Sequence, residues 1–156
     1  MNGYTVTVNS AEILSYQAYI SKYNLSKNDV TSLFENLDMS FPEMIYDVEL
    51  TITNTNISDN EEEHSGINFI HYHLNGTDFS LQISDPLYLI TNDAGNLMDG
   101  FRLRPKTEMG FHLPFYYPTS TVSDSLQTDA VLNDEVYLVV SLYPTVKQIL
   151  IDFNET

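Results

Sequence analysis

Apolar and polar side chains alternate with a period of two along much of the chain after residue 44, and this pattern constrains the fold most. In the segment 45–52 the apolar set is Tyr46, Val48, Leu50 and Ile52, and the polar set between them is Asp47, Glu49 and Thr51. Successive side chains of a strand point to opposite faces, so the segment predicts a strand with one dry and one solvated face. Such one-sided strands are typical of antiparallel sheets.

Further strands are predicted at 4–8, 67–74, 79–83, 87–90, 108–116, 136–143 and 146–153. Asn75-Gly76 predicts a two-residue hairpin turn. Pro114, inside a predicted strand, favours an edge position or a bulge, because proline cannot donate to a ladder. Roughly seven to nine short strands without a βαβ rhythm predict a mostly β fold, an antiparallel β-sandwich.

A helical period replaces this alternation near the N-terminus. One helical face is formed by Tyr16, Tyr19, Ile20 and Tyr23. This spacing predicts a turn of helix around 16–22, and a second helix is predicted around 28–37, after a capping-box spacing at Ser26 and Asp29. We expect a single domain over residues 1–156, with 9–43 as a helical and loop insertion after the first strand. Whether this insertion packs on the sandwich or extends from it stays open.

The charge balance excludes one class of partner. The chain has 22 acidic and 6 basic residues, a formal net charge of −16, and no cysteine. Such a chain repels phosphate backbones, so we expect no nucleic-acid partner. Without cysteine there is no disulfide, thiolate nucleophile or cysteine-ligated metal. No apolar run approaches the roughly 20 residues of a membrane span, and residues 1–4 do not resemble a signal peptide, so any export signal is expected upstream.

Three stretches carry a resemblance to a known family: residues 46–56, from Tyr46 to Asn56; residues 110–115, Gly-Phe-His-Leu-Pro-Phe; and residues 137–144 with 149–151. In these the chain resembles bacterial surface lipoproteins of the Firmicutes type, of unknown function. The resemblance implies an immunoglobulin-like antiparallel β-sandwich with a short N-terminal helical insertion. It also implies an extracellular or cell-surface location, a lipid-anchored cysteine upstream of residue 1, and an accessory role at the envelope. It implies no catalytic residue.

Metal binding is the sharpest chemical hypothesis that individual residues raise. His71 and His73 share one face of a predicted strand, and His112 would be the third imidazole ligand. In an immunoglobulin-like order their strands belong to different sheets, so we expect solvated histidines instead. Two acidic or polar loops offer oxygen ligands for calcium: Asp59, Glu61, Glu62 and Glu63; and Asn92, Asp93, Asn96 and Asp99. Neither has the ligand spacing of an EF-hand loop.

Glycan binding is the other hypothesis, with Tyr116, Tyr117 and Tyr143 as exposed stacking platforms, although core packing is the safer interpretation for most tyrosines. No nucleophile elbow, phosphate loop or dinucleotide-binding motif is present. We therefore assign no catalytic, cofactor-binding or metal-binding residue and no cofactor. The prediction is a non-enzymatic extracytoplasmic accessory or adhesion-type module, whose loops 57–66, 91–107 and 117–134 bind an envelope or surface protein. A glycan- or divalent-metal-binding module is the alternative, and an envelope-acting hydrolase is least favoured.

Overall fold

The computed structural model describes residues 3–57, 67–92, 100, 102–118, 124–141 and 146–155. The strands in these ranges are β1 (Tyr4–Ser15), β2 (Met44–Asn54), β3 (His73–Asn75), β4 (Ser80–Ile83), β5 (Glu108–Tyr116), β6 (Val136–Ser141), β7 (Lys147–Ile151) and β8 (Asn154–Glu155). The helices are α1 (Tyr16–Lys22), α2 (Lys27–Asn36), α3 (Asp85–Thr91) and α4 (Asp124–Leu132).

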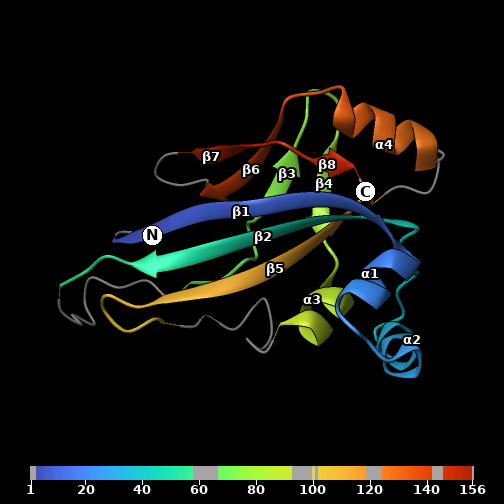
Figure 1. Cartoon of the computed structure of the whole chain (residues 1–156), viewed down its shortest axis with the longest axis horizontal. Helices are drawn as coiled ribbons and strands as arrows, with labels where there is room; N and C mark the ends of the chain where they lie inside the picture. The colour runs from blue at the N-terminus through green and yellow to red at the C-terminus, as the bar shows by residue number, and fades with distance from the viewer. Residues whose placement is uncertain are drawn as a thin grey trace.

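The described strands form one sheet in the order β7-β6-β3-β4-β5-β2-β1-β8. Neighbouring strands run antiparallel except for β1 and β8, which are parallel. The sheet curls until β7 lies beside β1, so that its shape approaches a barrel (Figure 1). The prediction of a mostly β, antiparallel fold is confirmed.

One core fills the inside of the curled sheet. The side chains of β2 that were predicted to face inward, Tyr46, Val48, Leu50 and Ile52, are all fully buried. Across from them, the Phe69 ring meets Phe111 at 5.0 Å and Tyr72 at 4.9 Å between centroids, both edge to face. Burial of each such side chain contributes about 1.5–3 kcal/mol, so this core accounts for most of the packing energy of the sheet.

The helical insertion packs on the sheet rather than extending from it, at the right-hand end of Figure 1. There α1, α2 and α3 enclose a second, smaller core with the ends of β1 and β2. Its buried members are Leu14, Tyr19, Ile20, Val30, Phe34, Ile45 and Leu87. This core fixes α1 against the outer face of the sheet, where the candidate site lies.

The first strand is longer than predicted, so the insertion begins after Ser15 and not at residue 9. The register of β1 against β2 shifts between Val8 and Ser10, which makes Asn9 the extra residue of a β-bulge. The bulge reverses the alternation, and the buried positions beyond it are Ala11 and Ile13. A strict period of two therefore ends at Val8 although the strand does not.

Both predicted helices are present as α1 and α2. The Ser15 and Ser26 hydroxyls each accept a hydrogen bond from the backbone N–H three residues on, at 3.1 and 3.4 Å. Each helix is followed by a non-glycine residue in the left-handed region, Asn24 with φ 50° and Asp38 with φ 52°. The short polar side chains of Asn and Asp tolerate this conformation better than most, which permits a tight helix end.

Several predicted boundaries are wrong. The 87–90 segment belongs to α3, in which Pro86 occupies the first turn, where a helix needs no donor from it. The 117–134 segment contains α4 and is not all loop. The 67–74 strand shrinks to β3, since residues 70–71 form a turn. The predicted hairpin exists, but its connection covers 76–79 and is closed by the Gly76 N–H to the Phe79 carbonyl at 3.0 Å.

The edge position predicted from Pro114 is also wrong, because β5 lies between β4 and β2. β4, however, pairs only with Phe115 and Tyr116 at the end of β5. The Ser84 N–H donates to the Pro114 carbonyl on that same side, at 2.8 Å. The nitrogen of Pro114 therefore faces the side of β5 on which the ladder with β4 has ended. A residue at this position needs no backbone N–H for pairing.

Candidate functional site

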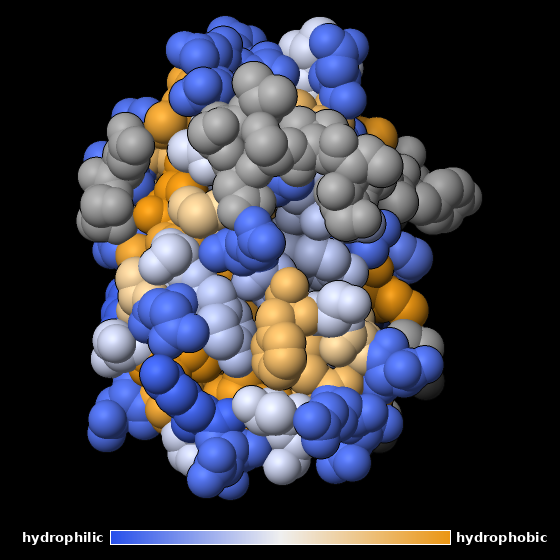
Figure 2. Space-filling model, turned by 90° about the vertical axis from the view of Figure 1, so that its right-hand side faces the viewer, coloured by the Kyte–Doolittle hydropathy of each residue, from blue (hydrophilic) through white to orange (hydrophobic). Residues whose placement is uncertain are grey.

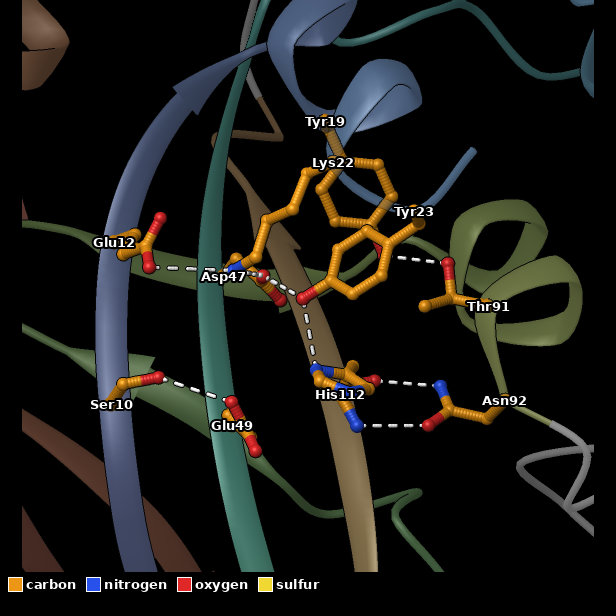
Figure 3. Close-up of polar contacts among 10 residues, drawn as sticks. All are labelled: Ser10, Glu12, Tyr19, Lys22, Tyr23, Asp47, Glu49, Thr91, Asn92 and His112. Carbon is orange, nitrogen blue, oxygen red and sulfur yellow. Dashed lines mark hydrogen bonds and ion pairs between the residues drawn. The ribbon is translucent and has the colours of Figure 1, made fainter. Parts of the chain in front are cut away.

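A polar cluster lies on the outer face of β1, β2 and β5, where α1 and the end of α3 cover the sheet (Figure 3). The side chains drawn there come from β1, β2, β5, α1 and α3, and from the residues that directly follow α1 and α3. They are Ser10, Glu12, Tyr19, Lys22, Tyr23, Asp47, Glu49, Thr91, Asn92 and His112. All ten side chains are polar or titratable, and together they form the candidate site.

Asp47 is the centre of the cluster. The alternation of β2 predicts it on a solvated face, but α1 covers it and the residue is only 2% exposed. Its Oδ2 accepts from the Lys22 ammonium at 3.0 Å and from the Tyr23 hydroxyl. Its Oδ1 is buried and has no hydrogen-bond partner among the described residues. A buried carboxylate is stable only when paired, so Asp47 requires α1 in place.

Tyr23 links Asp47 to His112. The Tyr23 hydroxyl has one proton, which it donates to Asp47, and its oxygen lies 2.9 Å from His112 Nδ1. His112 Nδ1 must then be the donor in the second bond, so the imidazole carries a proton on Nδ1. The Tyr23 ring also meets the His112 ring edge to face at 4.8 Å. The result is a chain of hydrogen bonds from β5 through α1 to β2.

Lys22 closes the cluster towards β1. Its ammonium lies 3.0 Å from Asp47 Oδ2 and 3.5 Å from Glu12 Oε1. Burial by itself lowers the pKa of Lys22, but the hydrogen bond to Asp47 and the charges of Asp47 and Glu12 outweigh it and raise the pKa. Lys22 therefore stays positively charged and neutralises the buried carboxylate.

The tyrosines of the cluster are held in their neutral form. Burial, followed by the hydrogen bond to Asp47 and the negative charge of Asp47, raises the pKa of Tyr23 far above its ordinary value. Burial and the charge of Asp47 likewise raise the pKa of Tyr19, whose hydroxyl lies 2.7 Å from Thr91 Oγ1 on α3. Both phenols act as neutral hydrogen-bonding groups at physiological pH.

The side chain of Asn92, directly after α3, makes the two backbone hydrogen bonds with β5 that a neighbouring strand would otherwise make. Its side-chain Nδ2 donates to the His112 carbonyl at 2.7 Å, and its Oδ1 accepts from the His112 N–H at 2.8 Å. One amide side chain thus satisfies both backbone groups of a strand residue beyond the reach of β4. The pair fixes His112 in the orientation that meets Tyr23.

Taken together, the cluster can clamp α1 to the sheet through charge-assisted hydrogen bonds to Asp47, and α3 through neutral hydrogen bonds of Thr91 and Asn92. The sequence did predict the helical face that bears Tyr19 and Tyr23, but the partners of these phenols were missed. The available signal was that this face ends in hydroxyl groups, which need polar partners when buried. For Tyr23 these partners are Asp47 and His112 on the polar faces of β2 and β5, and for Tyr19 the partner is Thr91 on α3.

The three histidines considered for a metal do not come together. His112 is engaged by Tyr23 and Asn92, whereas His71 is exposed and its carbonyl accepts a bond from His73 Nδ1 at 2.9 Å. Their strands β3 and β5 belong to one sheet with β4 between them, not to two sheets. Within the described ranges, no three His, Asp or Glu side chains form a group that could hold a metal ion.

Most of the residues proposed as calcium ligands lie outside the described residues. Asp59, Glu61, Glu62 and Glu63 lie outside the described residues, as do Asp93, Asn96 and Asp99. Of these two loops only Asn92 is described, and its side chain is bonded to His112 and to the Tyr88 carbonyl. Asn92 is therefore a structural residue in this fold.

The tyrosines considered as stacking platforms have different surroundings. Tyr117 is half-buried, with its ring 5.7 Å from Phe79, Tyr116 is half-buried too, and Tyr143 lies outside the described residues. Another half-buried tyrosine, Tyr137 of β6, borders a hollow of about 470 Å³. The other residues around this hollow are polar or glycine: Asn75, Gly76, Thr77, Asn133, Asp134, Glu135 and Gln148. Sequence reasoning missed this site, because the α4–β6 turn and the β3–β4 turn meet only in the fold.

The helical end of the molecule has a largely hydrophilic surface, interrupted by apolar atoms in its lower half (Figure 2). The apolar side chains that remain substantially exposed near α2 are Leu37, at 43%, and Phe41, at 44%. The Phe41 ring stacks on Phe34 at 4.6 Å and Tyr16 at 5.3 Å, so it closes the second core from outside.

In the part of the chain that the structure describes, no helix is long and apolar enough to cross a membrane. No curated protein and no solved structure matches the chain. A family match covers residues 1–147, which include β1 to β6 and the four described helices. The chain therefore belongs to the family described as "Domain of unknown function (DUF5028)".

Proposed function

We propose that the chain is a non-enzymatic binding module that acts outside the cytoplasm, as an accessory or adhesion-type domain of the cell envelope. One observation carries the proposal: the groups most able to do chemistry, Asp47, Tyr23 and Lys22, are bonded to one another across α1 and β2. A general acid or base needs a pKa near the working pH and contact with a substrate. The raised pKa values of Tyr23 and Lys22 and the burial of Asp47 favour a clamp instead.

The location outside the cytoplasm is part of this proposal. It is supported by the resemblance to surface lipoproteins and agrees with the net charge of −16, which suits an exposed, soluble surface. The finer assignment of the fold to an immunoglobulin-like sandwich belongs here too. It is supported by the way β1, β2 and β5 face β3 and β6 across one core, like the two layers of a sandwich.

The test is co-sedimentation of the purified domain with isolated cell envelopes of its source. We expect saturable binding that the His112→Ala variant retains, because that residue belongs to the clamp and not to a binding surface. Treating the envelopes with protease or with glycosidases then separates a protein ligand from a glycan. Absence of binding by the wild-type domain, or loss of binding in a folded His112→Ala variant, would contradict the proposal.

A glycan is the second candidate ligand, favoured by the hollow beside Tyr137. A tyrosine ring offers an apolar face for a sugar ring, and amide and carboxylate groups around it suit sugar hydroxyls. Asp134 joins the two turns that border the hollow, since its carboxylate accepts from the Thr77 N–H at 2.7 Å and from the Thr77 hydroxyl at 2.8 Å. These bonds lower the pKa of Asp134, so its carboxylate stays negatively charged.

Titration of soluble chitooligosaccharides into the labelled domain tests this second candidate by nuclear magnetic resonance. Shifts confined to Tyr137, Asn133 and Gln148 that disappear in Tyr137→Ala are expected. Tyr117→Ala serves as the matched control, because Tyr117 lies against Phe79 and does not line the hollow. Shifts that persist in Tyr137→Ala would exclude the hollow as the site.

A further inference from the structure

The hollow beside Tyr137 has one negatively charged wall. Among the described residues that line the hollow, Asp134 and Glu135 are charged and none is basic. Both belong to the turn between α4 and β6, which lies beside the turn between β3 and β4 at the top of Figure 1. A ligand in the hollow therefore meets two carboxylates and no cationic side chain of the lining.

The two carboxylates are held in place and still have acceptor positions to offer. Asp134 accepts from the Glu135 N–H at 2.8 Å, in addition to its two bonds from Thr77. These bonds occupy three of the roughly four acceptor positions of a carboxylate. Glu135 Oε2 accepts from the Tyr137 hydroxyl at 3.3 Å, and Glu135 Oε1 has no hydrogen bond in the described part of the chain. Both residues can therefore accept a hydrogen bond from a ligand.

The lysine nearest along the chain does not neutralise this wall. Lys147 directly precedes Gln148, which lines the hollow, but successive side chains of a strand point to opposite faces. Lys147 thus shares its face of β7 with Ile149 and Ile151, which belong to or pack against the main core. It lines a different hollow, beside β1. The negative charge of the wall is therefore not compensated from β7.

An apolar surface adjoins the charged wall. Tyr137 lies directly opposite Leu150 in the ladder between β6 and β7, and Leu150 is 57% exposed. Directly opposite side chains of an antiparallel pair lie on the same face, with Cβ atoms about 4.5–5.5 Å apart. The tyrosine ring and the leucine together offer a ligand an apolar platform next to the two carboxylates.

We propose that the glycan bound in this hollow is an amino sugar with a free, positively charged amino group. The C–H face of its ring packs on Tyr137 and Leu150, and its ammonium donates to the carboxylates of Asp134 and Glu135. An ammonium has three donors and no acceptor, so it suits a wall of acceptors, and a cation is also attracted to the face of an aromatic ring. The inference rests on the second proposed function, glycan binding in the hollow, and names the class of sugar.

Charge distinguishes this sugar from its chemical relatives. An N-acetylated sugar has the same ring but carries no ammonium for the two carboxylates. A uronic acid or a phosphorylated sugar is repelled both by the wall and by the net charge of −16, which attracts a cationic ligand. The free amino sugar is the member of the group that matches the platform and the wall together.

The experiment titrates glucosamine oligosaccharides and N-acetylglucosamine oligosaccharides of equal length into the labelled domain at low ionic strength. We expect wild type to bind the glucosamine oligomer about fivefold more tightly, the effect of one exposed ion pair. Glu135→Gln keeps the size of the side chain but removes its charge, and should lose most of this preference. Asp78→Asn is the matched control, because it removes one charge from the β3–β4 turn without changing the lining of the hollow. It should keep the preference, with thermal melts showing that both variants fold.

The outcomes separate the sugar class from glycan binding itself. Equal affinities of wild type for the two oligosaccharides would overturn the amino-sugar assignment and leave glycan binding in the hollow standing, whereas binding of neither would remove both. A preference that persists in Glu135→Gln, or that Asp78→Asn reduces as much, would show that the net charge of the domain attracts the sugar and would overturn the proposal. A lysine-containing peptide that binds as tightly and shifts the same resonances would identify a protein side chain as the occupant and would overturn the sugar assignment.

Discussion

Asp47 shows how one residue joins a helix to a sheet. It is placed by β2 on the outer face, yet it is as buried as the core residues on either side of it. Its negative charge is acceptable there because Lys22 and Tyr23 arrive from the end of α1. The energetic consequence is one-sided: the pair adds little over an apolar contact, but the loss of one member leaves a buried charge or dipole unmatched.

Replacing Asp47 by Ala should therefore destabilise the fold. We expect the free energy of unfolding to fall by about 2 kcal/mol, below the 3–5 kcal/mol typical of fully buried pairs, because Lys22 retains contact with water. Chemical denaturation measures the change. Glu12→Ala is the matched control, since it removes the less buried partner of the same ammonium and should cost less than about 1 kcal/mol. Equal effects of the two substitutions would refute the clamp.

Asn92 makes a similar prediction for the contact between α3 and β5. Asn92→Asp keeps an acceptor for the His112 N–H but loses the donor to the His112 carbonyl, whereas Asn92→Ala loses both. Both variants should lose about 1–3 kcal/mol of stability, the usual effect of an unsatisfied backbone group. Hydrogen exchange should still protect the His112 amide in Asn92→Asp and not in Asn92→Ala. Equal protection in both would show that Asn92 does not hold β5.

At the scale of elements, the sequence predicted those helices and strands whose formation depends on residues close together in the chain. Ser26 and the apolar spacing of Val30 and Phe34 were enough to place α2, because capping and periodicity act within a few residues. The end of β1 was not predictable, since the bulge at Asn9 depends on pairing with β2 some 40 positions away. The candidate site could not be predicted for the same reason, because Lys22 and Asp47 are 25 residues apart and no local rule pairs them.

The ends of the helices offer a prediction at this scale. Asp38 follows α2 with φ 52°, a conformation that glycine adopts at no steric cost. Asp38→Gly should raise the free energy of unfolding by about 0.5–1 kcal/mol, and Asp38→Ala should lower it, because alanine is disfavoured there. Thermal melts of the two variants give the comparison. A stabilised Asp38→Ala would mean that the helix end is not what limits stability at this position.

At the scale of the whole molecule, buried tyrosines connect stability to alkaline pH. Burial raises the pKa of Tyr88 to about 12 and raises the pKa values of Tyr19, Tyr23 and Tyr72 further. An unfolded chain releases these protons near pH 10, the ordinary tyrosine value, whereas the folded chain retains them. The stabilisation is thus complete below pH 10 and is lost as pH rises above it.

We therefore expect the domain to unfold cooperatively above pH 10, with the tyrosinate absorbance of its buried tyrosines and the loss of circular dichroism appearing together. Tyr88→Phe should make the stability above pH 10 fall less steeply, because one proton fewer separates the two states. Tyrosinate absorbance from all eleven tyrosines while the circular dichroism stays native would contradict the prediction.

The pairing of β1 with both β2 and β8 also orders events in time. β1 is synthesised before the other described strands, and its second neighbour is 142 residues further along the chain. Contacts of such separation form late and slow folding, because a long loop must close before they gain anything. Until β8 arrives, β1 has one satisfied edge and one open edge. Between the synthesis of β1 and that of β8, this open edge is therefore exposed to pairing with the wrong strand.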